Sequence, residues 1–304
     1  MYERHFALRE APFSITPDSS YFYPHEGAQG ALNTLLVALR SGEGFLKVIG
    51  EVGCGKTLLC RRLLRSLQDE CVTAYIPNPD MNREDLLRAL MRELGLVASP
   101  VGSESWPQLQ QLVLESLLRH AAEGRRVVVC IDEAQAMPLP TLETLRLLSN
   151  LETEKRKLLQ LVLLGQPELD GHLQRPEIRQ LLQRITYSEY LGPIPRTLIV
   201  GYLQHRLAVA ALSEATDTHV FEDDAGREIA HRTAGVPRLI NVLAHKGMLM
   251  AYGEGVHRVT RRHIDLAVMD TPGLQARSMD RWRYRWNVWR NICKTALGRG
   301  DRPT

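Results

Sequence analysis

The chain has 304 residues, 44% of them hydrophobic and 24% charged, with a formal net charge of +3, and these values are ordinary for a soluble globular protein. Its five cysteines include no C-x-x-C pair, and no apolar run reaches about eighteen residues. We therefore expect no disulfide framework, zinc site or membrane-spanning helix, and we expect a reducing, cytoplasmic environment. The length suggests one large domain and a smaller one.

The first 26 residues combine aromatic side chains with Pro12, Pro17 and Pro24, a composition that opposes a long helix. We expect the segment 1–26 to pack on the core through its aromatic side chains, with contact to the flat face of a bound ligand as the alternative. A helix is predicted next, over residues 27–44, because the apolar pattern ends there at a glycine.

A phosphate-binding pattern, G-x-x-x-x-G-K-[ST], is matched at every specified position by residues 50–57, GEVGCGKT. The flanking sequence predicts a strand at 45–49 and a helix at 58–67, which is the context that the pattern requires. Its glycines allow a tight turn whose backbone N–H groups point at phosphates, and the helix adds its positive end. The predicted nucleotide-binding residues are Gly50, Glu51, Val52, Gly53, Cys54, Gly55, Lys56, Thr57 and Leu58.

Two side chains of this loop have expected chemical roles. Lys56 can reach the β- and γ-phosphates of a nucleotide, and the Thr57 hydroxyl can ligate Mg²⁺. The alternative is a glycine-rich turn that binds nothing, but the correct flanks and the Lys-Thr ending argue against it.

The second chemical motif is RRVVVCIDEAQAM, at residues 125–137. Its apolar run predicts a parallel strand buried on both faces, which ends in two carboxylates where α/β sheets place their ligands. Asp132 is expected to hold Mg²⁺, mostly through water, and Glu133 to polarise the water that attacks the γ-phosphate. The alternative is an acidic strand end that only caps the next helix.

Strands and helices alternate from residue 45 to residue 195, which predicts a three-layer α/β domain over residues 27–195. One predicted strand, at 157–169, reaches Gln166, whose amide could hold the attacking water or the γ-phosphate; a plain turn amide is the alternative. From Arg196 onward the strand signal ends, and residues 196–272 are predicted to form a small helical domain.

These features resemble the AAA+ ATPases. Within that class, FALREAPFSITPDSSYFY, IDEAQ, LRLLSNLET, LLGQPEL, LLQRI and GVPRLIN are similar to motifs of the ExeA/GspA group of secretion and pilus ATPases, over residues 2–270. The resemblance implies a P-loop NTPase fold with a parallel sheet and a helical lid, and hydrolysis of ATP with Mg²⁺. A chain without a long C-terminal extension is most similar, within the group, to ATPases of MSHA-type pilus biogenesis.

The resemblance also implies roles for residues outside the loop. Gln166 stands at the first sensor position and Arg238, in GVPR, at the second. Arg184 stands where such families place an arginine that reaches a neighbouring subunit's γ-phosphate, with Arg179 as the second choice. A homo-oligomer with sites between subunits, such as a hexameric ring, is therefore implied. The implied catalytic set is Glu133, Lys56, Arg184, Gln166 and Arg238, with Thr57 and Asp132 at the metal.

The C-terminal residues 273–304 are not explained by an ATPase, and residues 276–304 hold eight Lys or Arg against two Asp or Glu. At helical spacing, one stripe within 281–297 gathers Trp282, Trp286, Trp289, Cys293 and Leu297. Such a basic helix suits an anionic membrane surface, or a groove on a partner or on this chain, and nucleic acid has the least support.

We therefore expect an ATP-hydrolysing assembly factor for pilus or type II secretion-like machinery. Inner-membrane platform proteins are the expected partners, and the expected location is the cytoplasm or the inner face of the cytoplasmic membrane. The alternative is a nucleotide-switched DNA-binding module, because transposition target-selection ATPases share this core. Salt-sensitive and sequence-indifferent DNA affinity would favour that alternative.

Overall fold

A computed structural model of the chain describes residues 2–96, 104–152, 157–272 and 274. The chain divides into two compact units, one formed by Thr16–Ile194 and the other by the described parts of Met1–Ile15 and Pro195–Thr304. Residues 1–26, expected to form one segment, are thus divided between the units after Ile15. The basic stretch at 281–297 lies outside the described residues.

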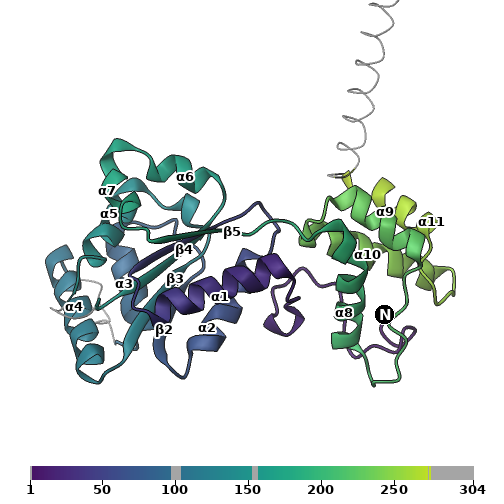
Figure 1. The fold of residues 1–304 in the computed structure, drawn as a ribbon, viewed down its shortest axis with the longest axis horizontal. Helices are drawn as coiled ribbons and strands as arrows, with labels where there is room; N and C mark the ends of the chain where they lie inside the picture. Colours follow the sequence, from purple (N-terminus) through teal and green to yellow (C-terminus); the bar gives the residue numbers. More distant parts are fainter. Residues whose placement is uncertain (1, 97–103, 153–156, 273, 275–304) are drawn as a thin grey trace, which may run out of the picture. The chain divides into compact units, whose positions relative to one another are not determined.

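The larger unit is built on a parallel sheet of five strands in the order β2-β3-β4-β1-β5 (Figure 1). From β1 the chain passes to the far edge of the sheet, returns strand by strand to β4, and then adds β5 on the other side of β1. β4 therefore separates β1 from β3. The strands are β1 Phe45–Ile49, β2 Cys71–Ile76, β3 Arg126–Ile131, β4 Gln160–Gly165 and β5 Tyr187–Tyr190.

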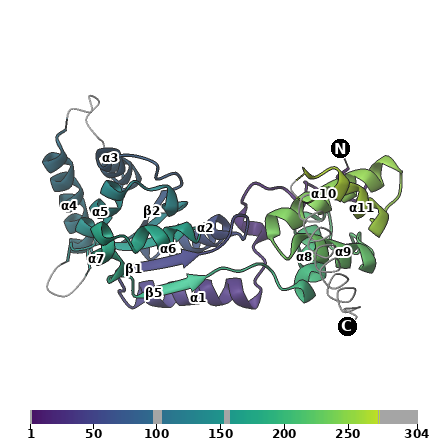
Figure 2. The same cartoon turned by 90° about the horizontal axis from the view of Figure 1, so that it is seen from above.

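Helices cover both faces of the sheet, which confirms the predicted three-layer α/β architecture (Figure 2). One face carries α1 Glu26–Arg40 and α2 Lys56–Leu67. Alternate side chains of each strand enter opposite layers, so Val128 faces α1 and α2 whereas Val127 and Val129 face the other side. The helices on that side are α3 Arg83–Glu93, α4 Trp106–Ala122, α5 Leu139–Leu148, α6 Glu168–Leu173 and α7 Arg179–Leu182.

The hydrophobicity of each strand follows its place in the sheet. The interior strands β3 and β4 are buried along almost their whole length. An interior parallel strand has helices on both faces and therefore needs a continuous apolar run, which is the pattern present in the sequence. The edge strand β5 instead leaves Tyr187 and Tyr190 exposed.

Helix starts follow capping signals. The side chain of Asn82 accepts a hydrogen bond from the Asp85 backbone N–H at 2.8 Å, which confirms the predicted start of α3. Before α4, the Ser105 backbone N–H donates to the Gln108 side chain at 2.7 Å, as in a capping box. Short 3-10 helices are η1 Ser19–Tyr21, η2 Ala134–Ala136, η3 Pro176–Ile178 and η4 Arg196–Leu198.

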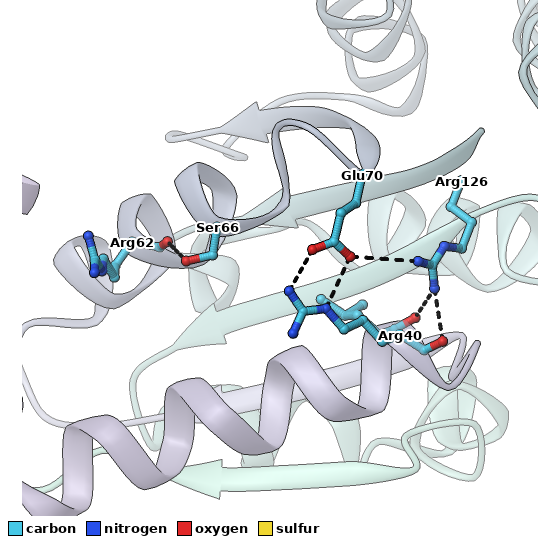
Figure 3. A network of polar contacts seen from close by, with 6 residues as sticks. Arg40, Arg62, Ser66, Glu70 and Arg126 are labelled. Carbon is cyan, nitrogen blue, oxygen red and sulfur yellow. Dashed lines mark hydrogen bonds and ion pairs between the residues drawn. The ribbon is translucent and has the colours of Figure 1, made fainter.

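Three charged side chains connect the end of α1 to the amino ends of two strands, β2 and β3 (Figure 3). Arg40, at the end of α1, donates to the Glu70 carboxylate in two hydrogen bonds of 3.0 and 2.5 Å. Arg126, at the start of β3, donates to the carbonyls of Leu39 and Arg40 at 3.1 and 2.9 Å. These bonds satisfy carbonyls that the end of a helix leaves without helical partners. The ion pairs are partly exposed, so solvent screens them and each contributes little to stability.

The second unit has the helical character predicted from residue 196 onward. Its helices are α8 Ile199–Ala210, α9 Asp223–Thr233, α10 Pro237–Gly253 and α11 Arg261–Met269. The beginning of the chain pairs with the end of α8, since the Arg9 N–H donates to the Ala210 carbonyl at 2.9 Å and the Leu212 N–H to the Ala7 carbonyl at 3.1 Å. None of the helices in the described part of the chain is long and apolar enough to cross a membrane.

A buried arginine of α8 anchors this N-terminal segment. Arg206 is only 5% exposed, and its Nε donates to the Pro12 carbonyl at 2.5 Å. Its Nη1 donates to the Tyr202 hydroxyl at 3.1 Å, and that hydroxyl donates to the Asn241 side chain at 2.8 Å. The segment also buries the aromatic side chains of Tyr2, Phe6 and Phe13.

Replacing Arg206 with alanine should destabilise the helical unit, because the Pro12 carbonyl and the Tyr202 hydroxyl would lose a buried partner. We expect the free energy of unfolding, measured by urea denaturation, to fall by about 2–4 kcal/mol. Arg262→Ala is the control: that side chain is 74% exposed, and its loss should change the same quantity by less than about 0.5 kcal/mol. Equal losses in the two variants would contradict the anchoring role.

Candidate nucleotide-binding site

The loop between β1 and α2 needs its glycines for two different reasons. Gly53 and Gly55 have backbone φ angles of 81° and 96°, in the left-handed region that favours glycine. Gly50 instead has a close neighbour, because a Cβ on it would lie 2.6 Å from the Leu191 carbonyl oxygen. The loop therefore turns tightly and lies against the segment that follows β5.

Lys56 and the first turn of α2 bring positive charge to the loop. Lys56 is 5% exposed, and its Nζ donates to the carbonyls of Gly50 and Glu51 at 2.7 and 3.1 Å. The first N–H groups of α2 have no partners within the helix and carry the positive end of its dipole. A chain of phosphates fits this combination of an ammonium group and unpaired N–H groups.

The other predicted loop residues differ in exposure. Glu51 and Val52 are exposed, Leu58 is half-buried and Cys54 is buried. Burial raises the pKa of the Cys54 thiol, so little reactive thiolate is present at neutral pH. Cys54 therefore contributes its backbone and its packing to the loop.

The two predicted metal ligands come together at the carboxyl ends of the strands. The Thr57 hydroxyl donates to Asp132 Oδ2 at 2.5 Å. Asp132 is only 2% exposed, and its Oδ1 accepts the Glu133 backbone N–H at 3.0 Å. One hydroxyl and one carboxylate fit Mg²⁺, which takes few protein oxygens and completes its shell with water and phosphate oxygens. Within the described ranges, no group of three or more His, Cys, Asp or Glu could form a metal cage.

Tyr75 of β2 belongs to the same cluster, although the sequence analysis did not select it. Its hydroxyl donates to Asp132 Oδ2 at 3.3 Å. Burial, and next the negative charge of Asp132, raise the pKa of the Tyr75 phenol, which keeps it a hydrogen-bond donor. Tyr75 lies opposite Cys130 in the neighbouring strand. Only this strand pairing brings it to Asp132, and no motif in the sequence signals it.

Glu133 is held by two amide side chains. Its backbone is left-handed, with φ 51° and ψ 36°, a conformation that costs about 1–2 kcal/mol for a residue with a side chain. Glu133 Oε2 accepts hydrogen bonds from Gln135 Nε2 at 2.6 Å and from Gln166 Nε2 at 3.1 Å. The structure thus brings together the predicted base and the predicted strand-end amide. Gln135 was not predicted as a site residue, although it is the last residue of the IDEAQ motif, two residues after Glu133.

Arg184 lies away from this cluster. It belongs to the turn between α7 and β5, just before β5 begins. Because β5 runs parallel to β1, its start lies at the edge of the sheet opposite the loop that follows β1. Lys157, and to a smaller extent Arg184, hold the pKa of Glu152 below its usual range at that edge. Arg179, the second choice, is exposed at the start of α7.

Arg238 belongs to the other unit. It is the second residue of α10, directly after Pro237, and it is exposed. A positive charge at a helix N-terminus opposes the helix dipole, which is a cost that a bound anion would offset. Its role as a second sensor stays a prediction.

Comparison with known proteins identifies an AAA domain at residues 39–173. General secretion pathway protein A of Aeromonas hydrophila is 40% identical over 276 residues, which are 90% of this chain and 49% of that protein. The chain therefore spans about half the length of this relative.

Several solved structures have a similar fold. The ORC2 protein of Aeropyrum pernix, in ADPNP-ADP complexes, has a TM-score of 0.65 at 17% identity, covering 86% of this chain and 71% of that one. Cdc6p of Pyrobaculum aerophilum has a TM-score of 0.65 at 20% identity, covering 83% and 71%. The Holliday junction branch migration motor RuvB of Thermotoga maritima has a TM-score of 0.54 at 17% identity, covering 81% and 68%. These likenesses show an α/β AAA+ fold with a helical C-terminal part.

Gly50→Ala should destabilise the larger unit, because a Cβ placed 2.6 Å from the Leu191 carbonyl oxygen forces the backbone to move. We expect the free energy of unfolding to fall by about 1–3 kcal/mol in urea denaturation. Gly30→Ala is the matched control. Nothing lies within 4 Å of a Cβ at Gly30, which is inside α1, so this change should stabilise by about 0.5–1 kcal/mol. A Gly50 variant as stable as the unchanged protein would contradict the close approach.

Proposed function

We propose that this chain, which fits the ExeA group of AAA+ ATPases, binds ATP with Mg²⁺ and hydrolyses it to ADP and phosphate. One observation carries the proposal: a lysine, a hydroxyl–carboxylate pair and a second carboxylate meet at the same edge of the sheet. They are Lys56, Thr57 with Asp132, and Glu133.

Each of these groups has a task in phosphoryl transfer. The Lys56 ammonium and the N–H groups of the loop bind and orient the phosphates. Thr57 and Asp132 would hold Mg²⁺, which neutralises phosphate charge when bound. The Glu133 carboxylate orients a water molecule and accepts its proton, and the Gln166 amide beside it can donate to the water or to the γ-phosphate.

We propose further that the active form is a homo-oligomer, such as a hexameric ring or a dimer. Arg184 lies at the edge of the sheet opposite the loop of its own chain. Arg184 would therefore contact the γ-phosphate of a nucleotide bound to a neighbouring subunit. A planar guanidinium with a permanent charge suits the charge that phosphoryl transfer spreads over several oxygens. The role that we propose for Arg238, in the helical unit, is that of the second sensor residue.

The cellular role that we propose is the assembly of secretion or pilus machinery at the cytoplasmic face of the inner membrane. The similarity to general secretion pathway protein A supports a role in secretion. Within that role we propose MSHA-type pilus biogenesis, which rests on the sequence resemblance alone. Platform proteins of the inner membrane are the proposed partners.

Glu133→Gln should abolish ATP hydrolysis while ATP binding is kept, because only the base is lost. We expect the turnover rate to fall about 10²–10⁴-fold and the dissociation constant for ATP, measured with a fluorescent analogue, to change little. Turnover by Glu133→Gln close to that of the unchanged protein would overturn the assignment of the base.

Arg184→Ala should lower turnover about 10³-fold or more if the arginine acts on a neighbouring subunit. The specific activity of the unchanged protein should then rise with protein concentration, because each site needs two chains. Arg179→Ala is the matched control and should retain turnover. Activity that is independent of concentration and indifferent to Arg184 would instead indicate a monomeric ATP switch.

The basic tail offers a test between the two cellular roles. Replacing Trp282, Trp286 and Trp289 together with alanine should abolish co-sedimentation with phosphatidylglycerol vesicles, because aromatic side chains insert at the membrane interface. Vesicles of phosphatidylcholine alone should bind weakly, since basic residues need anionic lipid. Strong binding to duplex DNA of any sequence, steeply weakened by salt and without vesicle binding, would favour the DNA-binding alternative.

A further inference from the structure

Gln135 occupies the short segment that directly follows the proposed base. It belongs to η2, which begins immediately after the left-handed residue Glu133. The left-handed turn sends the chain back over the end of β4, so the Gln135 side chain meets both Glu133 and Gln166. Gln135 is half-buried and touches neither the phosphate loop nor the Thr57–Asp132 pair in any described hydrogen bond.

The carboxamide of Gln135 uses its two ends on two different partners. Its Nε2 donates to Glu133 Oε2 at 2.6 Å. Its Oε1 accepts the backbone N–H of Gln166 at 3.0 Å. A single side chain thus connects the proposed base, on the loop after β3, to the backbone at the end of β4. A carboxamide is a planar, uncharged group that can donate from its nitrogen and accept at its oxygen at the same time.

The glycine that ends β4 leaves room for two side chains, those of Leu169 and Gln135. A Cβ on Gly165 would lie 3.2 Å from Gln135 Oε1 and 2.7 Å from Leu169 Cδ2. Gly165 is not among the glycines with a positive φ in the described part of the chain. The lack of space for a Cβ therefore accounts for a glycine at this position, and an unusual backbone conformation does not. The carboxamide of Gln135 therefore sits in a space that the backbone leaves open for it.

We propose that Gln135 is a positioning residue for ATP hydrolysis, which fixes the Glu133 carboxylate by tying it to the end of β4. The inference rests on the proposed ATPase function. Both amide donors, Gln135 and Gln166, bind the same oxygen of Glu133, and no described residue donates to the other oxygen, Oε1. Oε1 is thus the oxygen that would accept the proton of the attacking water. Gln135 makes the shorter bond, so it keeps Glu133 oriented when the Gln166 amide turns to a γ-phosphate.

Two substitutions separate the two bonds of Gln135. Gln135→Ala removes both, whereas Gln135→Glu keeps an acceptor for the Gln166 N–H and removes the donor to Glu133. In both variants we expect turnover at saturating ATP to fall about 100-fold, the size expected for a misplaced catalytic group. The dissociation constant for ATP should stay within about twofold, because the phosphate loop is not touched. Gln111→Ala is the matched control, since it removes an exposed bond of the same kind, from Gln111 Nε2 to Glu115 Oε1 at 2.9 Å.

Turnover in a Glu133→Gln background tests whether Gln135 acts through Glu133. A positioning residue should have little further effect there, measured by single-turnover phosphate release, because effects of groups that act as a unit are not additive. A fall of about 100-fold in that background as well, or weakened ATP binding in the single variants, would overturn the proposal in favour of a general structural role.

Hydrogen exchange of the Gln166 backbone amide, followed by NMR, tests the connection without any catalysis. Exchange should accelerate in Gln135→Ala and remain slow in Gln135→Glu and Gln111→Ala. An unchanged exchange rate in Gln135→Ala would overturn the connection even if turnover fell. If the unchanged protein hydrolyses no ATP, that result alone contradicts the proposed function. The exchange rates of the Gln166 amide would still show whether Gln135 connects Glu133 to the end of β4.

Discussion

The hydrogen bond from the Thr57 hydroxyl to Asp132 is the contact on which the geometry of the site depends. Thr57 stands at the start of α2 and Asp132 at the end of β3, and β4 lies between β1 and β3. The bond therefore reaches past β4 and ties the loop that follows β1 to the end of β3. Between these two strands, the order of the strands in the sheet changes direction. Ligands of open α/β sheets bind at such a switch, because loops diverge there and leave room at the carboxyl ends. Without this bond, the loop after β1 would lose its link to the end of β3.

The two ends of the sheet have different chemistry. At the amino ends, Arg40, Glu70 and Arg126 close the end of α1 and the start of two strands with partly exposed ion pairs, which contribute modestly to stability. At the carboxyl ends, Asp132 is almost fully buried. It accepts hydrogen bonds from Thr57 at the start of α2 and from Tyr75 in β2, so these bonds depend on the positions of both elements. A carboxylate buried in this way costs free energy unless it is paired. The hydroxyl groups of Thr57 and Tyr75, which donate to it, offset that cost, and the proposed Mg²⁺ would offset more of it.

The N-terminal segment shows how a single stretch can serve two units. Its first part is fixed to α8 by the buried Arg206, whereas its later part lies with the sheet unit, where Arg61 donates to the Pro17 carbonyl. The chain thus passes between the units at Ile15–Thr16 as well as at Ile194–Pro195. Each unit holds its own share of the segment by hydrogen bonds to backbone carbonyls, and such bonds depend little on the identity of the segment's residues.

The sequence by itself determined the glycine-rich turn at residues 50–57, the strand that ends just before Asp132 and Glu133, the layered α/β class and the start of α3 at Asn82. Each of these depends on local pattern: glycine spacing, an apolar run or a cap. The tertiary structure alone decided which strands are neighbours. That order brings Tyr75 to Asp132 and Gln135 to the backbone of Gln166, and it places Arg184 at the edge opposite the loop. It also divided the N-terminal segment. Contacts between distant parts of a chain follow from the packing of whole layers, and no short sequence window contains that information.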